Sequence, residues 1–161
     1  VLRRLHDGGI RRFYLAGSMG MEDPMMVASL FRRAVKEFPG CEFGYHVHNL
    51  SGQGTANVLA AVDAGASFIE GSICGIGGGI AMPTCVASEG NLPTEDLVCM
   101  FESMGVRTGV SPQEAVAASR EIAALLGITA GSHASQIGTR DEMLNQGKHN
   151  PRNPQTAARD A

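Results

Sequence analysis

The chain has 161 residues, of which 43% are hydrophobic and 18% are charged, and its formal net charge is -3. This length accommodates one domain with a hydrophobic core and leaves little room for a second. Because the chain is mildly acidic, lacks a basic stripe and has no apolar run near the roughly 20 residues of a membrane span, we expect neither nucleic acid nor a membrane as a partner.

The cysteines indicate a reducing compartment. They show neither CxxC spacing nor the density of a disulfide framework: Cys41, Cys74, Cys85 and Cys99. We therefore expect a cytoplasmic location, or the mitochondrial matrix if the source is eukaryotic. The chain opens in what reads as the end of a helix, so we expect a fragment in which a targeting peptide could not be seen.

The first half of the chain alternates between strand and helix patterns. Residues 2–8 read as a helix end closed by glycine, and residues 10–16 read as a strand because of their β-preferring bulk. Asp23 followed by Pro24 predicts the start of a helix. Apolar residues then recur at helical spacing and predict a stripe that faces the core: Val27, Leu30, Phe31, Ala34 and Phe38.

Two more strands and a helix follow. Residues 42–48 and 67–73 are predicted strands, and residues 55–64 between them form a predicted helix. A glycine loop comes after the third strand, and Thr94 is predicted to cap the next helix. Alternation of this kind implies an α/β fold with parallel strands joined by right-handed crossovers.

The second half of the chain is predicted to be helical and then polar. Glu95 and Asp96 lie in the first turn of the helix that Thr94 opens, where the helix dipole favours acids. The Ser-Pro-Gln-Glu sequence at residues 111–114 is a capping box that starts another helix. From residue 132 onward the chain turns polar, and we expect its last residues to form a loose tail.

Two histidines lie one residue apart at the end of the second predicted strand. Because side chains alternate along a strand, His46 and His48 project from the same face. Two imidazoles on one face can hold a single divalent ion. The spacing alone fits two packed histidines better than a metal pair, so the sequence that follows has to decide between these interpretations.

A series of motifs follows the pair in a fixed order. They are His46-Val47-His48-Asn49, Gly52-Gln53 with Asn57, Ala64-Gly65-Ala66, Gly75-Ile76-Gly77-Gly78, and the stretch from Gly90 to Val98. Between about residue 15 and residue 108, this order and spacing resemble the 3-hydroxy-3-methylglutaryl-CoA lyase family. That family belongs to a metal-dependent superfamily that also contains isopropylmalate and homocitrate synthases. The Gly-Asn-x-x-Thr-Glu-Asp stretch points to the lyase branch.

The resemblance implies a TIM (β/α)8 barrel, whose usual length is about 250 residues. The chain would then supply the C-terminal portion of the barrel. We expect residues 1–130 to form a partial barrel domain and residues 131–161 a C-terminal extension that is loose at its end. Active sites of such barrels lie at the carboxyl ends of the strands, which is where His46 and His48 fall.

The resemblance also implies a metal site. In the family, the two histidines and an asparagine after the glycine loop bind one divalent cation, Mg²⁺ or Mn²⁺, and the matching positions here are His46, His48 and Asn91. Taken by itself, Asn91 beside a glycine fits a turn or cap residue. A further family ligand, an aspartate on the first strand with an arginine beside it, has no counterpart in this chain.

The reaction that the resemblance implies is a reverse Claisen cleavage of a 3-hydroxyacyl-CoA to acetyl-CoA and an oxo acid. His46 would be catalytic as well as a ligand. The substrate would be bound by Gly77, Gly78, Gly79 and Asn49. The resemblance identifies an acyl-CoA as the partner and leaves a homodimer open as the assembly.

Several positions depart from the family pattern. The cysteine that acts as an acid–base group in the family is replaced by Gly79, and Cys85 in the longer loop that follows is the candidate for this role, with Cys74 as a weaker one. An idle thiol is the alternative for both. The acid expected after the first strand is Gly17, and the acid on the third strand is Glu70.

Two other functions compete with the lyase. A Claisen-condensing synthase of the same superfamily runs the related reaction in the bond-forming direction. A metal-binding but catalytically silent homologue would explain Gly79 and Gly17. A dinucleotide site at Gly75 and Gly77 is disfavoured, because the third glycine of that motif would fall on Ile80.

Overall fold

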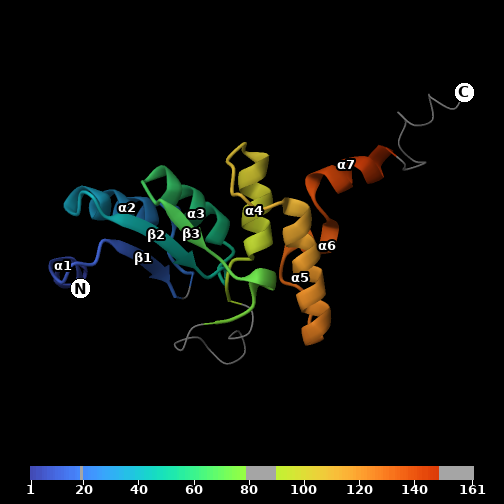
Figure 1. Ribbon diagram of the computed structural model, residues 1–161, viewed down its shortest axis with the longest axis horizontal. Helices are drawn as coiled ribbons and strands as arrows, with labels where there is room; N and C mark the ends of the chain where they lie inside the picture. The colour runs from blue at the N-terminus through green and yellow to red at the C-terminus, as the bar shows by residue number, and fades with distance from the viewer. Residues whose placement is uncertain (19, 79–89, 149–161) are drawn as a thin grey trace, which may run out of the picture.

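Three parallel strands form the sheet of this protein. The computed structural model describes residues 1–18, 20–78 and 90–148. Within these ranges, β1 (Arg12–Gly17), β2 (Glu42–Val47) and β3 (Phe68–Glu70) pair in the order β1-β2-β3. The α/β class and the parallel pairing expected from the sequence are therefore confirmed (Figure 1).

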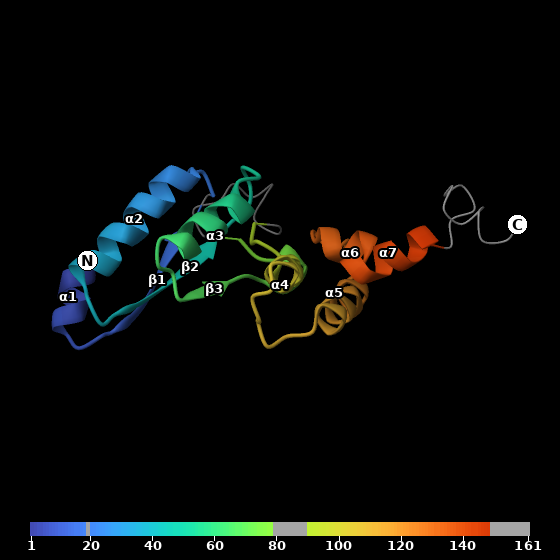
Figure 2. The ribbon, with the colours of Figure 1, turned by 90° about the horizontal axis from the view of Figure 1, so that it is seen from above.

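Helices cover one face of the sheet. α1 (Leu2–Asp7) precedes β1, α2 (Pro24–Glu37) joins β1 to β2, and α3 (Gly54–Asp63) joins β2 to β3. Figure 2 shows α2 and α3 side by side above the same face, and the two helices are in contact. In the part of the chain that the structure describes, no helix covers the opposite face, which we call the open face.

The second half of the described chain is helical. A short 3₁₀ helix, η1, follows β3, and then come α-helices: η1 (Ile73–Gly75), α4 (Thr94–Ser103), α5 (Pro112–Leu126), α6 (His133–Ile137) and α7 (Arg140–Lys148). α5 and α6 both pack on α4, and η1 contacts α4 and α5. Figure 1 shows α5, α6 and α7 at the end of the molecule farthest from α1. Sequence patterns did not reveal α6 and α7.

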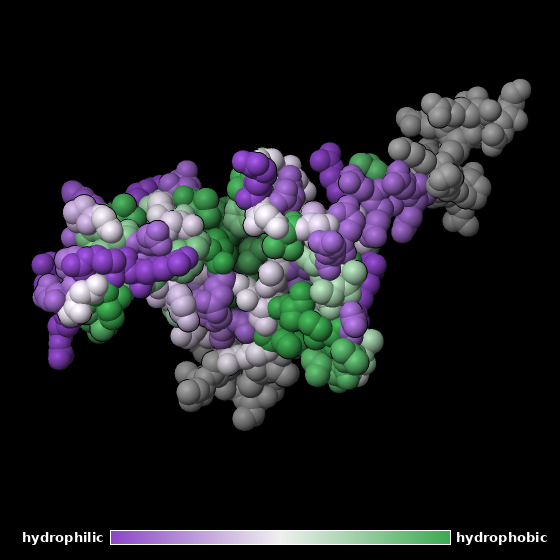
Figure 3. Space-filling model, in the orientation of Figure 1, coloured by the Kyte–Doolittle hydropathy of each residue, from purple (hydrophilic) through white to green (hydrophobic). Residues whose placement is uncertain are grey.

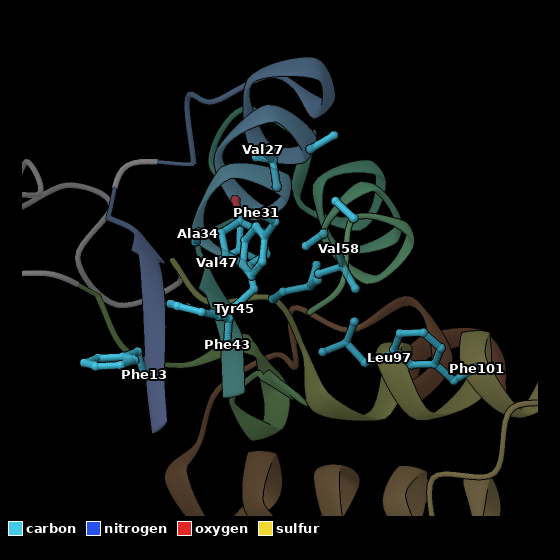
Figure 4. Close-up of a cluster of buried hydrophobic side chains, with 14 of the residues drawn as sticks. Phe13, Val27, Phe31, Ala34, Phe43, Tyr45, Val47, Val58, Leu97 and Phe101 are labelled. Carbon is cyan, nitrogen blue, oxygen red and sulfur yellow. The ribbon is translucent and has the colours of Figure 1, made fainter. Parts of the chain in front are cut away.

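The core lies between the sheet and its two covering helices (Figure 4). Phe43, Tyr45 and Val47 alternate along β2 and are buried on the helix side. Phe31 of α2 and Val58 of α3 are fully buried against them, and the ring of Phe31 meets that of Tyr45 edge-on at 5.5 Å. This two-residue periodicity leaves the alternate positions of β2, including His46, on the open face.

One apolar residue of α2 is not where the sequence predicted it. Leu30 was assigned to the stripe that faces the core, but it is 44% exposed. The buried positions of α2 are Val27, Ala28, Phe31 and Ala34. Because successive helical residues are about 100° apart, Leu30 falls at the outer side of this stripe.

Two predicted boundaries also differ from the structure. Thr94 is the first residue of α4 rather than its cap, and Pro93 stands at the N-cap without a side-chain hydrogen bond. The third strand is shorter than the predicted 67–73, because the chain bends into η1 soon after Glu70. Ser72 then pairs with Pro93 in an isolated parallel bridge.

The predicted helix starts at two other places are confirmed. Asp23 accepts hydrogen bonds from the backbone N–H groups of Met25 and Met26, at 2.8 and 2.9 Å. Ser111 accepts one from the N–H of Glu114 at 3.3 Å. Each cap satisfies backbone donors that the first turn of a helix leaves without partners.

The surface of the C-terminal helices carries an apolar area. Figure 3 shows apolar side chains gathered at the lower end of α5, where Leu125 and Leu126 are 78% and 57% exposed. Among the described helices, none combines the length and apolar character that crossing a bilayer requires.

A glycine in the middle of β2 allows an aromatic ring to pack across the open face. In the strand register, Gly44 lies between Tyr14 and Phe68. The Phe68 ring crosses over Gly44, where a Cβ would collide with it, and reaches Arg12, whose guanidinium lies 4.5 Å from the ring centroid. Arg12 in turn pairs with Glu42, with Nε and Oε2 3.2 Å apart.

Gly44→Ala should therefore lower the free energy of unfolding by about 1–3 kcal/mol, because the Phe68 ring must move and lose its contact with Arg12. Urea denaturation followed by circular dichroism measures this change. In a Phe68→Ala background the same substitution should cost under about 1 kcal/mol, since the obstacle is gone. Equal costs in the two backgrounds would contradict this account of the open face.

Candidate functional site

The two histidines of the His-x-His motif meet at the carboxyl end of β2. His46 lies within the strand, and His48 lies just beyond it, in an isolated antiparallel bridge with Asn91. Their Nε2 atoms are 3.1 Å apart, and their ring planes are inclined by 74°. At this distance two nitrogen lone pairs repel each other unless a proton or a cation lies between them.

The environment of His48 favours its neutral imidazole. His48 is buried, and burial lowers its pKa, with a further lowering from the neighbouring His46 ring. A hydrogen bond with the Ser18 backbone and the negative charge of Glu22 oppose this shift without reversing it. The neutral form is the one that binds a metal ion, because the ligand nitrogen needs a free lone pair.

The backbone of Asn91 is held beside the two histidines by its bridge with His48. Hydrogen bonds on both sides of the bridge, from Asn49 N to Gly90 O at 2.7 Å and from Leu92 N to Val47 O at 3.2 Å, attach this segment to the end of β2.

The orientation of the Asn91 amide follows from a single hydrogen bond. Its Nδ2 donates to the carbonyl of Ile76 at 2.8 Å. Its Oδ1 is buried and has no hydrogen-bond partner in the described chain. Because Nδ2 donates to a carbonyl, the amide atom without a partner is the oxygen. This oxygen can bind a cation or accept a hydrogen bond.

These residues fit part of a site for a divalent cation. Two ligands at right angles on a cation with bonds of about 2.1 Å lie about 3 Å apart, which matches the 3.1 Å between the Nε2 atoms of His46 and His48. Two imidazole nitrogens and an amide oxygen suit a hard or borderline ion. The set is incomplete, since the described residues contain no group of three or more His, Cys, Asp or Glu placed to hold a metal.

A glycine makes room for the Asn91 amide. Gly77 has φ +93°, and a Cβ on it would lie 2.8 Å from Asn91 Nδ2. Its carbonyl also accepts a hydrogen bond from Gly90 N at 2.9 Å. Gly78 ends this described segment, while Gly79 and Cys85 lie outside the described residues.

Asn49, predicted to bind substrate, has a structural contact of its own. Its Oδ1 accepts a hydrogen bond from Gly54 N at 2.8 Å, at the start of α3. A Cβ on Gly54 would lie 2.7 Å from that oxygen. The amide oxygen of Asn49 therefore holds the turn into α3.

The acids of the first turn of α4 do more than complement the helix dipole. Glu95 is completely buried, and its two carboxylate oxygens accept from Cys74 N at 3.1 and 3.2 Å. It also accepts from the hydroxyls of Ser119 on α5 and Ser135 on α6, at 2.6 and 3.3 Å. One carboxylate thus connects η1, α5 and α6.

Asp96 completes this connection at the start of α6. Its carboxylate accepts hydrogen bonds from the Ser132 hydroxyl at 2.8 Å and from the N–H groups of His133 and Ala134 at 3.0 and 2.8 Å. The acid therefore caps a helix that begins more than thirty residues later in the chain. Such a long-range contact leaves no signal in local sequence patterns.

The thiol of Cys74, the weaker acid–base candidate, is engaged in a hydrogen bond. It is 1% exposed, and its Sγ donates to the carbonyl of Ser119 at 3.1 Å. Its φ of 60° is in the left-handed region, which the hydrogen bond from its N–H to Glu95 supports. The backbone of Cys74 thus carries the turn into the glycine loop, while its side chain packs on α5.

Glu22 is a residue near the site that the sequence did not single out. A Cβ on Gly17, where the family pattern expects an acid, would lie 3.0 Å from Glu22 Oε2 and 3.1 Å from the Tyr45 hydroxyl. Burial and the negative charge of Glu22 raise the pKa of Tyr45 to about 12. A carboxylate therefore lies beside Gly17, supplied from the turn before α2.

Comparison with known proteins connects this geometry to a family. The family model described as HMGL-like matches residues 1–122. Hydroxymethylglutaryl-CoA lyase, mitochondrial, from Pongo abelii is 32% identical over 136 residues, which cover 84% of this chain and 41% of that protein. The chain thus spans less than half the length of this relative.

Solved structures agree with the sequence match. An HMG-CoA lyase from Acinetobacter baumannii, in complex with coenzyme A and 3-methylmalate, has a TM-score of 0.77 and 31% identity, with 86% of this chain and 44% of that chain covered. The carboxyl transferase domain of Rhizobium etli pyruvate carboxylase, with pyruvate and biocytin, has a TM-score of 0.61 and 17% identity, with 91% of this chain and 25% of that chain covered. At this low identity, the similarity shows the fold alone. The chain is part of a TIM barrel, as the sequence predicted.

Glu95→Ala should lower the free energy of unfolding by about 3–5 kcal/mol, because three buried donors lose their acceptor. Urea denaturation measures the loss, and hydrogen exchange at the Cys74 amide should accelerate in parallel. Glu95→Gln is the matched control: it keeps one acceptor oxygen and should cost less than half as much. A loss under about 1 kcal/mol for Glu95→Ala would show that the carboxylate does not hold these helices together.

Proposed function

The chain belongs to the HMGL-like family, and from this membership we propose that it supplies the C-terminal portion of a divalent-metal-dependent carbon–carbon lyase. The proposed substrate is a 3-hydroxyacyl-CoA of the hydroxymethylglutaryl-CoA type, and the products are acetyl-CoA and an oxo acid. One observation carries the proposal: the His46 and His48 Nε2 atoms lie 3.1 Å apart at the end of β2, beside the bridge to Asn91.

The proposed cation is Mg²⁺ or Mn²⁺. His46 and His48 would hold it through Nε2, and Asn91 would hold it through the buried Oδ1 that has no partner in the described chain. Other positions would be filled by substrate oxygens and by a carboxylate from outside residues 1–161. When bound, the cation supplies Lewis acidity that makes the substrate hydroxyl easier to deprotonate.

The surrounding backbone would orient the reacting groups. The Ile76 carbonyl fixes the Asn91 amide, and Gly77 keeps the space beside that amide free of a side chain. We assign the substrate contacts to the backbone of Gly77, Gly78 and Gly79 and to Nδ2 of Asn49. Backbone groups held in this way can bind a substrate oxygen without reorganising during the reaction.

Proton movements complete the reaction. The tertiary hydroxyl loses its proton, the bond between the acetyl group and the hydroxyl-bearing carbon breaks, and the electron pair passes to the acetyl thioester. The α-carbon of the acetyl thioester enolate formed in this way must then take up a proton. We assign this protonation to Cys85, which lies outside the described residues, and we assign His46 a catalytic role beside its role as a ligand.

The proposed partners follow from the reaction. An acyl-CoA is the substrate, and the Acinetobacter baumannii relative with coenzyme A supports this assignment. A homodimer and a cytoplasmic or mitochondrial-matrix location stay predictions.

The complete polypeptide that contains residues 1–161 should bind Mn²⁺, as measured by electron paramagnetic resonance. His46→Ala or His48→Ala should weaken this binding by at least about 100-fold, because each removes a ligand nitrogen. His133→Ala is the control, since this histidine is 89% exposed on α6 and should leave the affinity unchanged. Unchanged Mn²⁺ affinity in both ligand variants would refute the proposed site.

With Mn²⁺ and a panel of hydroxyacyl-CoA esters, the complete polypeptide should release acetyl-CoA. Consumption of acetyl-CoA with an oxo acid would instead identify a synthase, and metal binding without either reaction would identify a silent homologue. Cys85→Ala should lower kcat by about 100- to 10,000-fold and leave Mn²⁺ affinity intact. Cys99→Ala on α4 is the control, and full activity of the Cys85 variant would show that its thiol is idle.

A further inference from the structure

We propose that Glu70 is a positioning residue for His46. Its carboxylate accepts the Nδ1 proton of the His46 ring and thereby keeps the Nε2 lone pair directed toward His48. The inference rests on the proposed function, because the direction of Nε2 matters when that atom is a metal ligand.

The strand register places the two side chains together. His46 on β2 and Glu70 on β3 are direct partners in the parallel ladder, and both side chains lie on the open face. Glu70 Oε1 is 3.4 Å from His46 Nδ1. That separation is slightly longer than a formed N–H···O hydrogen bond, so a small rotation of the half-exposed Glu70 side chain completes it.

The surroundings of His46 leave its Nδ1 to Glu70. This nitrogen is buried and has no hydrogen-bond partner in the described chain. On the β1 side, the ladder partner of His46 is Ala16, which has no polar side-chain atom. The Tyr14 ring lies farther away, at 6.2 Å between centroids. In this row of the sheet, Glu70 therefore carries the one side-chain acceptor.

The tautomer of His46 decides whether the pair can bind a cation. A neutral imidazole carries its proton on one of its two nitrogens. If the proton is on Nε2, it lies in the 3.1 Å gap between the two rings and blocks the ligand position. An acceptor at Nδ1 draws the proton to the far side of the ring, fixes the ring orientation and increases the basicity of Nε2.

The test uses the complete polypeptide with ¹⁵N-labelled histidine, without metal and at a pH where the rings are neutral. Two-bond ¹H–¹⁵N spectra should show the His46 proton on Nδ1 in the parent protein and on Nε2 in Glu70→Ala. Glu70→Gln keeps an acceptor oxygen and should retain the Nδ1 proton. Glu42→Ala is the control, because it removes another carboxylate from the open face of β2 and should change nothing at His46.

Mn²⁺ affinity gives the second measurement. Glu70→Ala should weaken binding by about 10- to 100-fold, Glu70→Gln by less, and Glu42→Ala not at all. If the parent protein binds Mn²⁺ and Glu70→Ala leaves the tautomer unchanged, the positioning role is overturned, even if affinity falls through loss of charge. If the parent protein does not bind Mn²⁺, the proposed metal function fails, and the tautomer spectra still decide whether Glu70 orients His46.

Discussion

The backbone bridge between His48 and Asn91 is the contact on which the candidate site depends. It joins the end of β2 to the segment that leads into α4, and hydrogen bonds on both sides of it involve main-chain atoms alone. Because main-chain bonds do not depend on side-chain identity, the backbone at position 91 lies beside His48 whatever residue stands there. The side chains then supply chemistry, and the carbonyl of Ile76 supplies the orientation of the amide.

The same segment connects the site to the C-terminal helices. Glu95 is a completely buried carboxylate, and such a group is costly unless each oxygen has partners. Its described partners are a backbone N–H on η1 and the hydroxyls of Ser119 on α5 and Ser135 on α6. The turn of Cys74, which starts the glycine loop, is therefore stabilised by α5 and α6. Loop geometry near the histidines and the packing of the distant helices form one hydrogen-bonded unit.

Local patterns predicted what depends on local contacts. The strands, the Asp23 and Ser111 caps and the shared face of His46 and His48 follow from spacing within a few residues. The contact of Glu70 with His46 depends on which strand pairs with which, and in which register. Helix α6 has five residues and few apolar ones, and its start is capped by Asp96 from another helix, so no pattern within it indicates a helix. Which residues far apart in the chain come into contact is the information that a single sequence does not display.

The barrel fold does not by itself decide the reaction, since a carboxyl transferase domain shares it. On the proposed function, the acid–base group is the part of the site that departs from the family pattern, while His46, His48 and Asn91 keep that pattern. Gly90 N donates to Gly77 O at 2.9 Å, so the described segments on the two sides of residues 79–89 meet at this hydrogen bond. On the proposed function, the bridge fixes the backbone beside which a cation would bind. On the proposed function, the longer loop with Cys85 and the glycine at position 79 are therefore compatible with an intact metal site.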